Sequence, residues 1–62
     1  MYDLVGIDGN AFSIMGYVRK AMRKEGYSSE EIEKYTNEAK SGDYMHLICV
    51  SQDMVEQLNK RL

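Results

Sequence analysis

Two short turn signals divide this 62-residue chain into three segments, and each segment has apolar residues at the spacing of an α-helix. The turns are Gly26-Tyr27-Ser28 and Ser41-Gly42-Asp43, in which glycine and small polar residues favour chain reversal. The sequence contains no proline, so no residue forbids helix inside the segments. This division predicts a mainly α protein, a three-helix unit in one small domain of residues 1–62.

The first predicted helix covers residues 11–25. Asn10 is suited to cap its start, and Gly26 is suited to end it in a left-handed conformation. Gly16 inside the helix costs about 1 kcal/mol relative to alanine. This suggests either the close approach of another backbone or an imperfection that the helix tolerates. We expect Phe12 to cover the N-terminal arm or the turn. The predicted buried stripe repeats at three- and four-residue steps: Ala11, Ile14, Met15, Val18, Ala21 and Met22.

The second and third helices are predicted over residues 29–40 and 44–61. Ser28 and Glu31 have the spacing of a capping box, and Asp43 is suited to cap the third helix. In the second helix the apolar face is Ile32, Tyr35 and Ala39. In the third it is Tyr44, Leu47, Ile48, Ser51, Met54, Val55, Leu58 and Leu62. An alternative takes residues 45–50 as a strand beside the N-terminal arm, in a β-α-α-β-α order, but the continuous helical stripe favours helix.

Residues 1–8 are expected to form an extended arm, because Val5 and Ile7 favour strands. Asp8-Gly9-Asn10 follows as a turn signal directly before the first helix. Amides at a helix N-terminus can hold an anion, so this turn is a candidate ligand site. The simpler interpretation is a turn with an N-cap, since the Asp8 carboxylate would repel an anion.

Size and charge exclude several classes of protein. A chain this short buries only about 60% of its unfolded surface, so we expect self-association, as a homodimer, to add stability. The net charge of −2 argues against a general nucleic-acid binder. We find no secretory signal and no apolar run that could span a bilayer. A lone cysteine, Cys49, cannot form an internal disulfide and fits a reducing cytoplasm.

Four cations are grouped on the polar side of the first helix: Arg19, Lys20, Arg23 and Lys24. Such a patch could hold a phosphate backbone or an acidic protein surface. Alternatively it is a solvated face, partly neutralised by glutamates of the second helix and favoured by the helix dipole.

Three further residues are candidates for binding or chemistry. Tyr17 lies off the first apolar stripe and is the best candidate for an exposed interface anchor, since tyrosine is amphipathic. His46 and Cys49 lie three residues apart on the third helix, where they could share a metal with a second subunit or form a Cys–His pair. We favour a histidine near the first turn of the helix and a small buried or half-buried cysteine, and we expect no metal, no cofactor and no catalytic residue.

Several segments together resemble a group of short, uncharacterised bacterial and phage proteins. The shared pattern is Leu4-Val5-Gly6 with Asp8-Gly9-Asn10-Ala11-Phe12, then Arg19-Lys20-Ala21 with Arg23-Lys24, then Ser41-Gly42-Asp43-Tyr44 with His46-Leu47. This resemblance implies helix after Ser41 and implies no activity.

A looser resemblance is to ubiquitin-associated three-helix modules, over residues 22–48. Their Met-Gly-Phe/Tyr loop would fall at Glu25-Gly26-Tyr27, where Glu25 departs from the pattern. The similarity is one of shape.

These features predict a small protein-interaction module that associates with itself and acts as an adaptor or inhibitor of a larger partner. The alternative is a small nucleic-acid-binding module that uses the cations of the first helix. We do not expect an enzyme, because a 62-residue unit rarely encloses a pocket of several hundred Å3.

Overall fold

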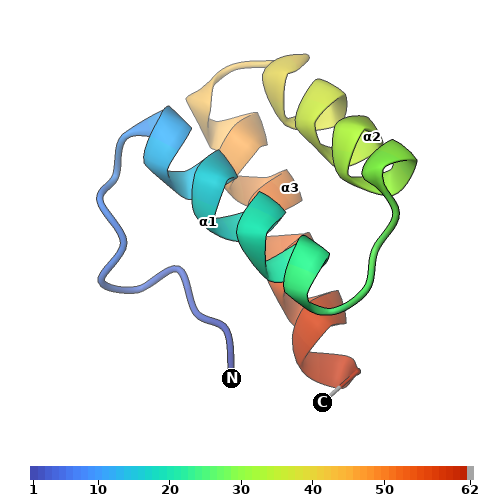
Figure 1. The fold of residues 1–62 in the computed structure, drawn as a ribbon. Coiled ribbons are helices and arrows are strands. Elements are labelled where there is room, and N and C mark those ends of the chain that lie inside the picture. Colours follow the sequence, from blue (N-terminus) through green and yellow to red (C-terminus); the bar gives the residue numbers. More distant parts are fainter. Residues whose placement is uncertain (62) are drawn as a thin grey trace.

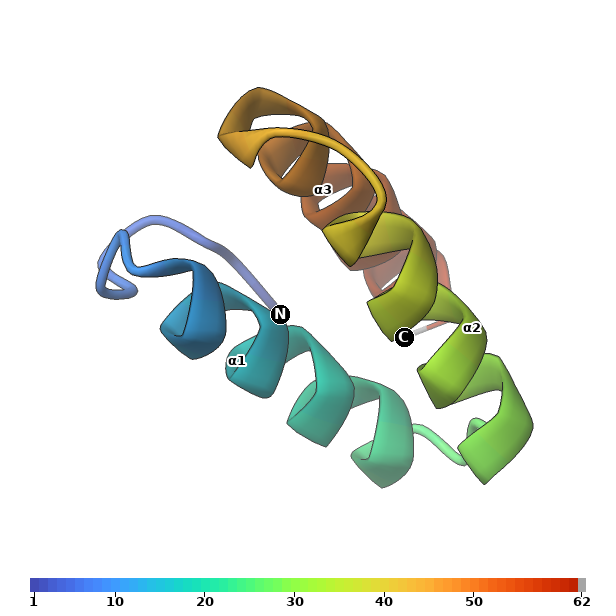
Figure 2. The same cartoon turned by 90° about the horizontal axis from the view of Figure 1, so that it is seen from above.

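The computed structural model describes residues 1–61 and shows three α-helices in that range, with no strand. The helices are α1 (Ala11–Lys24), α2 (Ser29–Lys40) and α3 (Tyr44–Lys60). They run down, up and down in the view of Figure 1, and each contacts the other two, so the molecule is a triangular bundle (Figures 1 and 2). The mainly α prediction is confirmed. The alternative strand over residues 45–50 is wrong, because this segment lies inside α3.

Local capping explains where α1 begins and ends. The Asn10 side chain accepts a hydrogen bond from a backbone amide of the first turn and so satisfies a donor that the helix leaves open. At the other end Gly26 has a φ of 89°, and the Tyr27 amide donates to the Met22 carbonyl at 3.0 Å. These are features of a Schellman motif. The motif ends α1 at Lys24, one residue before the predicted end.

Side-chain caps also begin α2 and α3. Ser28 and Glu31 exchange hydrogen bonds, with the Glu31 amide donating to the serine hydroxyl and the Ser28 amide donating to the glutamate. The predicted capping box is therefore present. Asp43 accepts a hydrogen bond from the His46 amide at 2.9 Å, as expected for a cap. α3 ends at Lys60, again one residue before the predicted end.

The core forms where one apolar stripe from each helix meets the other two. Ala11, Ile48 and Met54, which we expected in the stripes, are only partly buried. Tyr44 is 48% exposed, because its hydroxyl donates to the Gly9 carbonyl at the molecular surface. Leu62 lies outside the described residues. The buried apolar side chains are Ile14, Met15, Val18, Ala21, Met22, Ile32, Tyr35, Ala39, Leu47, Val55 and Leu58.

One polar pair crosses this core. The hydroxyls of Tyr35 on α2 and Ser51 on α3 share a hydrogen bond of 2.6 Å, and Ser51 is completely buried. Burial raises the pKa of the Tyr35 phenol, since the charged form loses its hydration. The pair joins α2 to α3 and leaves no unpaired polar atom at their contact.

The N-terminal arm is folded, and our expectation of an extended arm is wrong over Leu4–Ile7. The Ile7 amide donates to the Leu4 carbonyl at 3.1 Å, which closes a turn. Gly6 makes this turn possible with a φ of 89°, a conformation that glycine adopts without strain. An isolated strand would leave its backbone groups unpaired, and residues 1–61 contain no second strand to pair with it.

Long-range hydrogen bonds hold the arm across the seam between α1 and α3. The Tyr2 amide donates to the Asn59 side chain at 2.7 Å, and the Asn59 amide group donates back to the Tyr2 carbonyl at 2.9 Å. The Tyr2 hydroxyl donates to Glu25 at the end of α1. The Asp3 amide donates to the Tyr17 hydroxyl at 3.0 Å. The arm therefore covers one of the three seams of the bundle and leaves the other two open.

Candidate interaction surfaces

The seam between α2 and α3 opens into a groove of about 430 Å3, which we call the apolar groove. Met22 of α1 lies at its base, and Tyr27 closes one end. From α2 the lining residues are Glu31, Lys34, Tyr35 and Glu38, and from α3 they are Val50, Asp53, Met54 and Gln57. Each set follows a helical spacing of three and four residues, so one face of each helix forms one wall.

The rim of the apolar groove is acidic. Three carboxylates surround it, from Glu31, Glu38 and Asp53, and one cation, Lys34, opposes them. The pKa of Glu31 is lowered, first by the hydrogen bond from the Ser28 amide and then by the serine hydroxyl, so this carboxylate is charged at neutral pH. An apolar base with a negative rim suits a partner that offers an apolar side chain beside cations.

The seam between α1 and α2 is also open, but it is polar. We call this second cavity, again of about 430 Å3, the polar groove. Arg19 and Arg23 line it from α1 and Lys40 lines it from α2, with the Glu33 carboxylate among them. Lys20 is exposed on α1 but does not line this groove.

The cations of α1 form no ion pair with the described residues. The only ion pair within residues 1–61 joins His46 and Glu38, far along the chain from Arg19. Glu33 of α2 lines the same groove, but no glutamate of α2 lies within ion-pair distance of these cations. The cations are thus left available for an anionic partner.

The prediction of Tyr17 as an exposed anchor is wrong. The arm partly buries it, the Asp3 amide donates to its hydroxyl, and Tyr2 packs against its ring with 6.3 Å between the centroids. The reverse holds for Phe12, which we expected to cover the arm and which is 78% exposed. A helical spacing places both residues outside the core stripe, but only the path of the arm decides which one is covered.

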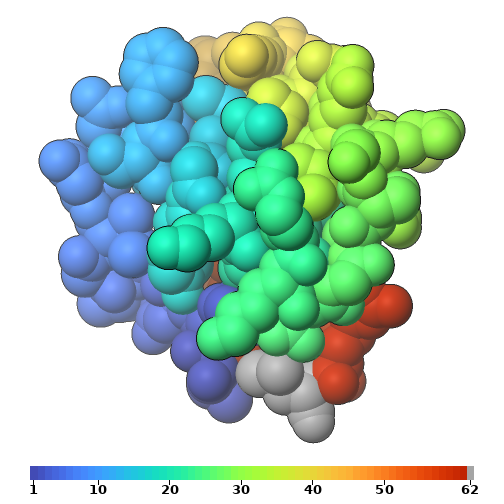
Figure 3. All heavy atoms as spheres, in the orientation of Figure 1, coloured from blue at the N-terminus to red at the C-terminus, as the bar shows by residue number. Residues whose placement is uncertain are grey.

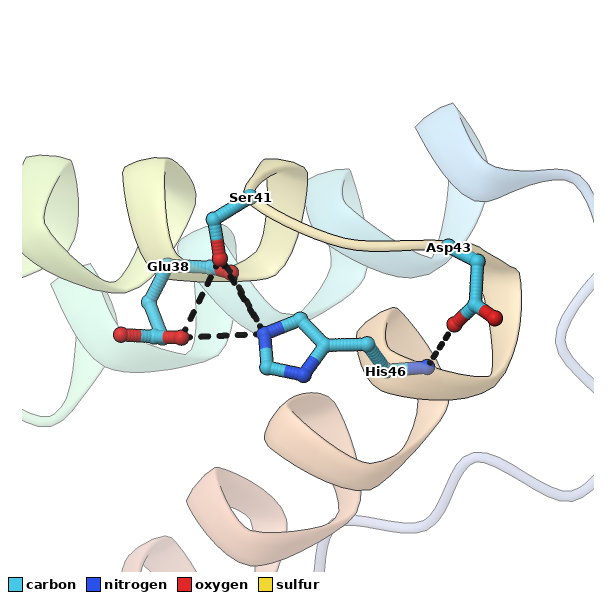
Figure 4. A network of polar contacts seen from close by, with 4 residues as sticks. All are labelled: Glu38, Ser41, Asp43 and His46. Carbon is cyan, nitrogen blue, oxygen red and sulfur yellow. Dashed lines mark hydrogen bonds and ion pairs between the residues drawn. The ribbon is translucent and has the colours of Figure 1, made fainter.

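His46 belongs to a polar network that its spacing from Cys49 did not reveal (Figure 4). Its Nε2 lies 2.9 Å from a Glu38 carboxylate oxygen and 3.0 Å from the Glu38 carbonyl oxygen. Because these atoms act as acceptors, Nε2 carries the hydrogen and donates. Nε2 therefore cannot accept a hydrogen bond from the Ser41 hydroxyl, which is 3.2 Å away. The network ties α2 to α3 across their turn.

Gly42 allows this network to form. A Cβ atom at this position would lie 2.8 Å from the His46 Cβ, a distance that side chains do not tolerate. From the sequence, Gly42 is expected only to favour the turn between the second and third helices. The structure shows that its lack of a side chain gives the imidazole room.

The Asp8-Gly9-Asn10 segment is a turn and a cap. The Asp8 side chain accepts from the Asn10 amide at 3.1 Å, and the Asn10 side chain caps α1. The Gly9 carbonyl accepts from the Tyr44 hydroxyl, which brings the starts of α1 and α3 together. The Asn10 and Phe12 amides are therefore already hydrogen-bonded within the turn and the cap, which favours the interpretation as a turn with an N-cap.

Cys49 is exposed, so the prediction of a buried or half-buried cysteine is wrong, and its thiol forms no disulfide with the described residues. Residues 1–61 contain no cluster of three histidine, cysteine or carboxylate side chains that could hold a metal ion. None of the helices in this range is both long and apolar enough to cross a membrane.

Comparisons of this chain with protein-family models, with curated proteins and with solved structures found no match.

Proposed function

We propose that this chain is a small protein-interaction module, adaptor- or inhibitor-like, whose binding site is the apolar groove between α2 and α3. The groove carries the proposal because it presents the partly exposed side chains of Tyr27, Val50 and Met54 to a partner. Tyrosine and methionine are enriched at protein interfaces, where they supply large contact areas. The ligand that fits is an amphipathic helix with an apolar side chain and flanking cations.

The same proposal includes self-association and a cytoplasmic location. An exposed, unpaired thiol at Cys49 suits a reducing compartment. A place among short bacterial and phage proteins belongs to the proposal as well, and it rests on the residue pattern alone.

A selection from a displayed library of amphipathic helical peptides tests the groove. Peptides enriched on the wild-type protein should bind Val50→Glu at least about tenfold more weakly, because a charge in the groove opposes apolar contact. Val5→Glu is the matched control, since Val5 is 85% exposed in the arm. Amide shifts in NMR titrations should change along the groove walls. Enrichment of no peptide, or equal binding to both variants, would contradict the proposal.

A second candidate function is nucleic-acid binding by the cations of α1. The specific observation in its favour is that Arg19, Lys20, Arg23 and Lys24 have no ion-pair partner among residues 1–61. Phosphate contacts would make the logarithm of the affinity fall steeply with the logarithm of salt concentration. Fluorescence anisotropy with DNA and RNA duplexes measures this dependence. If alanine at all four positions leaves affinity and salt slope unchanged, this function is excluded.

A further inference from the structure

Three features of α1 lie on its outer face and have no use within the fold. The aromatic ring of Phe12 is 78% exposed. Gly16, one turn later, is exposed, and a Cβ built on it would meet no atom within 4 Å. Arg19, Lys20 and Arg23 follow at the next turns, all exposed. Steps of three and four residues align these positions in one stripe, which we call the outer stripe of α1.

The outer stripe and the apolar groove lie on opposite sides of the molecule. Met22 extends from the inner side of α1, where it is buried, and forms the base of the groove. The stripe therefore points away from the groove. Figure 3 shows the α1 side of the molecule, with the side chains of α1 at the front and not covered by the arm or by α2.

Charge is divided unequally between α1 and the rest of the chain. α1 contains four basic residues and no acidic one. The ten acidic residues and the other four basic residues of the chain all lie outside α1. The net charge is therefore +4 within α1 and −6 in the rest of the chain. Glu38 and Asp53, at the acidic rim of the groove, belong to this negatively charged part of the chain.

We propose that the apolar groove of one copy binds the outer stripe of α1 of a second copy, head to tail. The inference rests on the proposed function, because it names the occupant of the same groove. Phe12 supplies the apolar side chain that Val50 and Met54 can contact. The cations that follow it face the carboxylates of the rim, and their long apolar stems cover more of the groove. Gly16 lets the two backbones approach closely.

The dimensions agree with this arrangement. Each wall of the groove covers eight residues, or about 10 Å of helix, and the stripe from Phe12 to Arg23 spans about 16 Å. One helix can thus place Phe12 over the apolar base and its cations over the rim. Since the two surfaces of each copy differ, the contact is heterologous, and it builds rings or open chains instead of a closed two-fold dimer.

Two charge-reversed variants test the arrangement by complementation. Arg19→Glu/Lys20→Glu reverses the charge of the stripe and leaves the groove unchanged. Asp53→Lys/Gln57→Lys reverses the charge of the groove rim and leaves the stripe unchanged. All four positions are exposed, so the fold should persist, which circular dichroism checks. Sedimentation velocity at rising protein concentration should show association of the wild type that weakens at least about tenfold between low and high salt.

Each variant alone should associate at least about tenfold more weakly than the wild type, since one of its two surfaces is lost. Mixed together, they should associate again, because the intact groove of the first variant binds the intact stripe of the second in a heterodimer. The two reversed surfaces also carry opposite charges, so larger mixed assemblies are expected as well. Gln52→Glu/Lys60→Glu lowers the net charge by three units at exposed positions outside both surfaces and should associate like the wild type. Phe12→Ala, at an exposed position, should also weaken association.

A wild-type protein that stays monomeric to about 1 mM, where interactions of about 4 kcal/mol would appear, would overturn the inference. So would a mixture of the two variants that forms no heterodimer, or a wild type that stops at two copies. If peptides from the display selection still bind the apolar groove in any of these cases, the proposed function stands and only the second copy is excluded as its occupant.

Discussion

Replacement of Gly16 by alanine should stabilise the protein. Gly16 lies in the middle of α1, and a Cβ at this position would meet no atom within 4 Å. The substitution therefore adds no steric strain. Glycine in a helix interior costs about 0.5–1 kcal/mol relative to alanine, because the unfolded chain loses more conformational freedom on folding. Gly16→Ala should raise the free energy of unfolding by that amount.

For a domain of this size, 1 kcal/mol corresponds to about 4–8 °C in Tm, so a rise of about 2–8 °C is expected. Circular dichroism at 222 nm during urea and thermal denaturation measures both quantities. The protein concentration should be kept in the low micromolar range, so that association adds nothing to the stability. An unchanged m-value would show that the unfolding transition exposes the same surface.

An equal or lower stability of Gly16→Ala would refute this reasoning, since it would mean that the outer side of α1 is not open at this residue. The same variant carries a second expectation. If a neighbouring copy approaches Gly16 closely, the added methyl group should weaken association while it strengthens the fold. A gain in stability together with a loss of association would explain why a residue unfavourable to the helix is present.

Three further predictions concern contacts between segments distant in sequence. Gly42→Ala should lower the free energy of unfolding by about 1–3 kcal/mol in urea denaturation, because its Cβ would lie 2.8 Å from that of His46; a variant as stable as the wild type would show that the turn adapts freely. Tyr35→Phe and Ser51→Ala should each lower the free energy of unfolding by about 1–3 kcal/mol in urea denaturation, since each single change leaves a buried hydroxyl unpaired. The double variant should lose less than the sum of the two, and additive losses would contradict this. The hydrogen bond to a carboxylate raises the pKa of Tyr2 to about 12, so a spectrophotometric titration should lose its highest-pH phenol in Tyr2→Phe. Because the folded-state value is raised, the stability from this bond is present below about pH 10 and is lost as the pH rises toward 12; an unchanged titration curve would contradict the assignment.

The helices and their caps could be predicted from sequence because each signal acts over a few residues. The Asn10, Ser28 and Asp43 side chains all bond amides two or three residues along the chain. Gly26 likewise acts on the end of its own helix. The apolar stripes were predictable for the same reason, since helical spacing alone places residues on one side.

Contacts between distant segments could not be predicted in this way. Tyr2 and Asn59 are 57 residues apart, and the Asn59 side-chain amide forms both hydrogen bonds to the Tyr2 backbone. No sequence pattern marks Asn59 as the partner of the arm. That contact directs the arm over Tyr17 and leaves Phe12 exposed. The apolar groove was missed for a similar reason. Spacing places Glu38 and Asp53 on the surfaces of their helices, but only the packing of α2 against α3 brings them to one rim.

The arm also explains why one seam of the bundle, and not all three, offers an apolar binding surface. Three helices packed in a triangle create three seams, and each seam leaves partly exposed apolar residues along its edges. The arm covers the seam between α1 and α3 through Tyr2 and Asp3. Arg19, Arg23 and Lys40 make the seam between α1 and α2 polar. The seam between α2 and α3 has no covering segment and only one cation, Lys34, in its lining. Contact with another molecule is therefore the remaining way to bury its apolar surface.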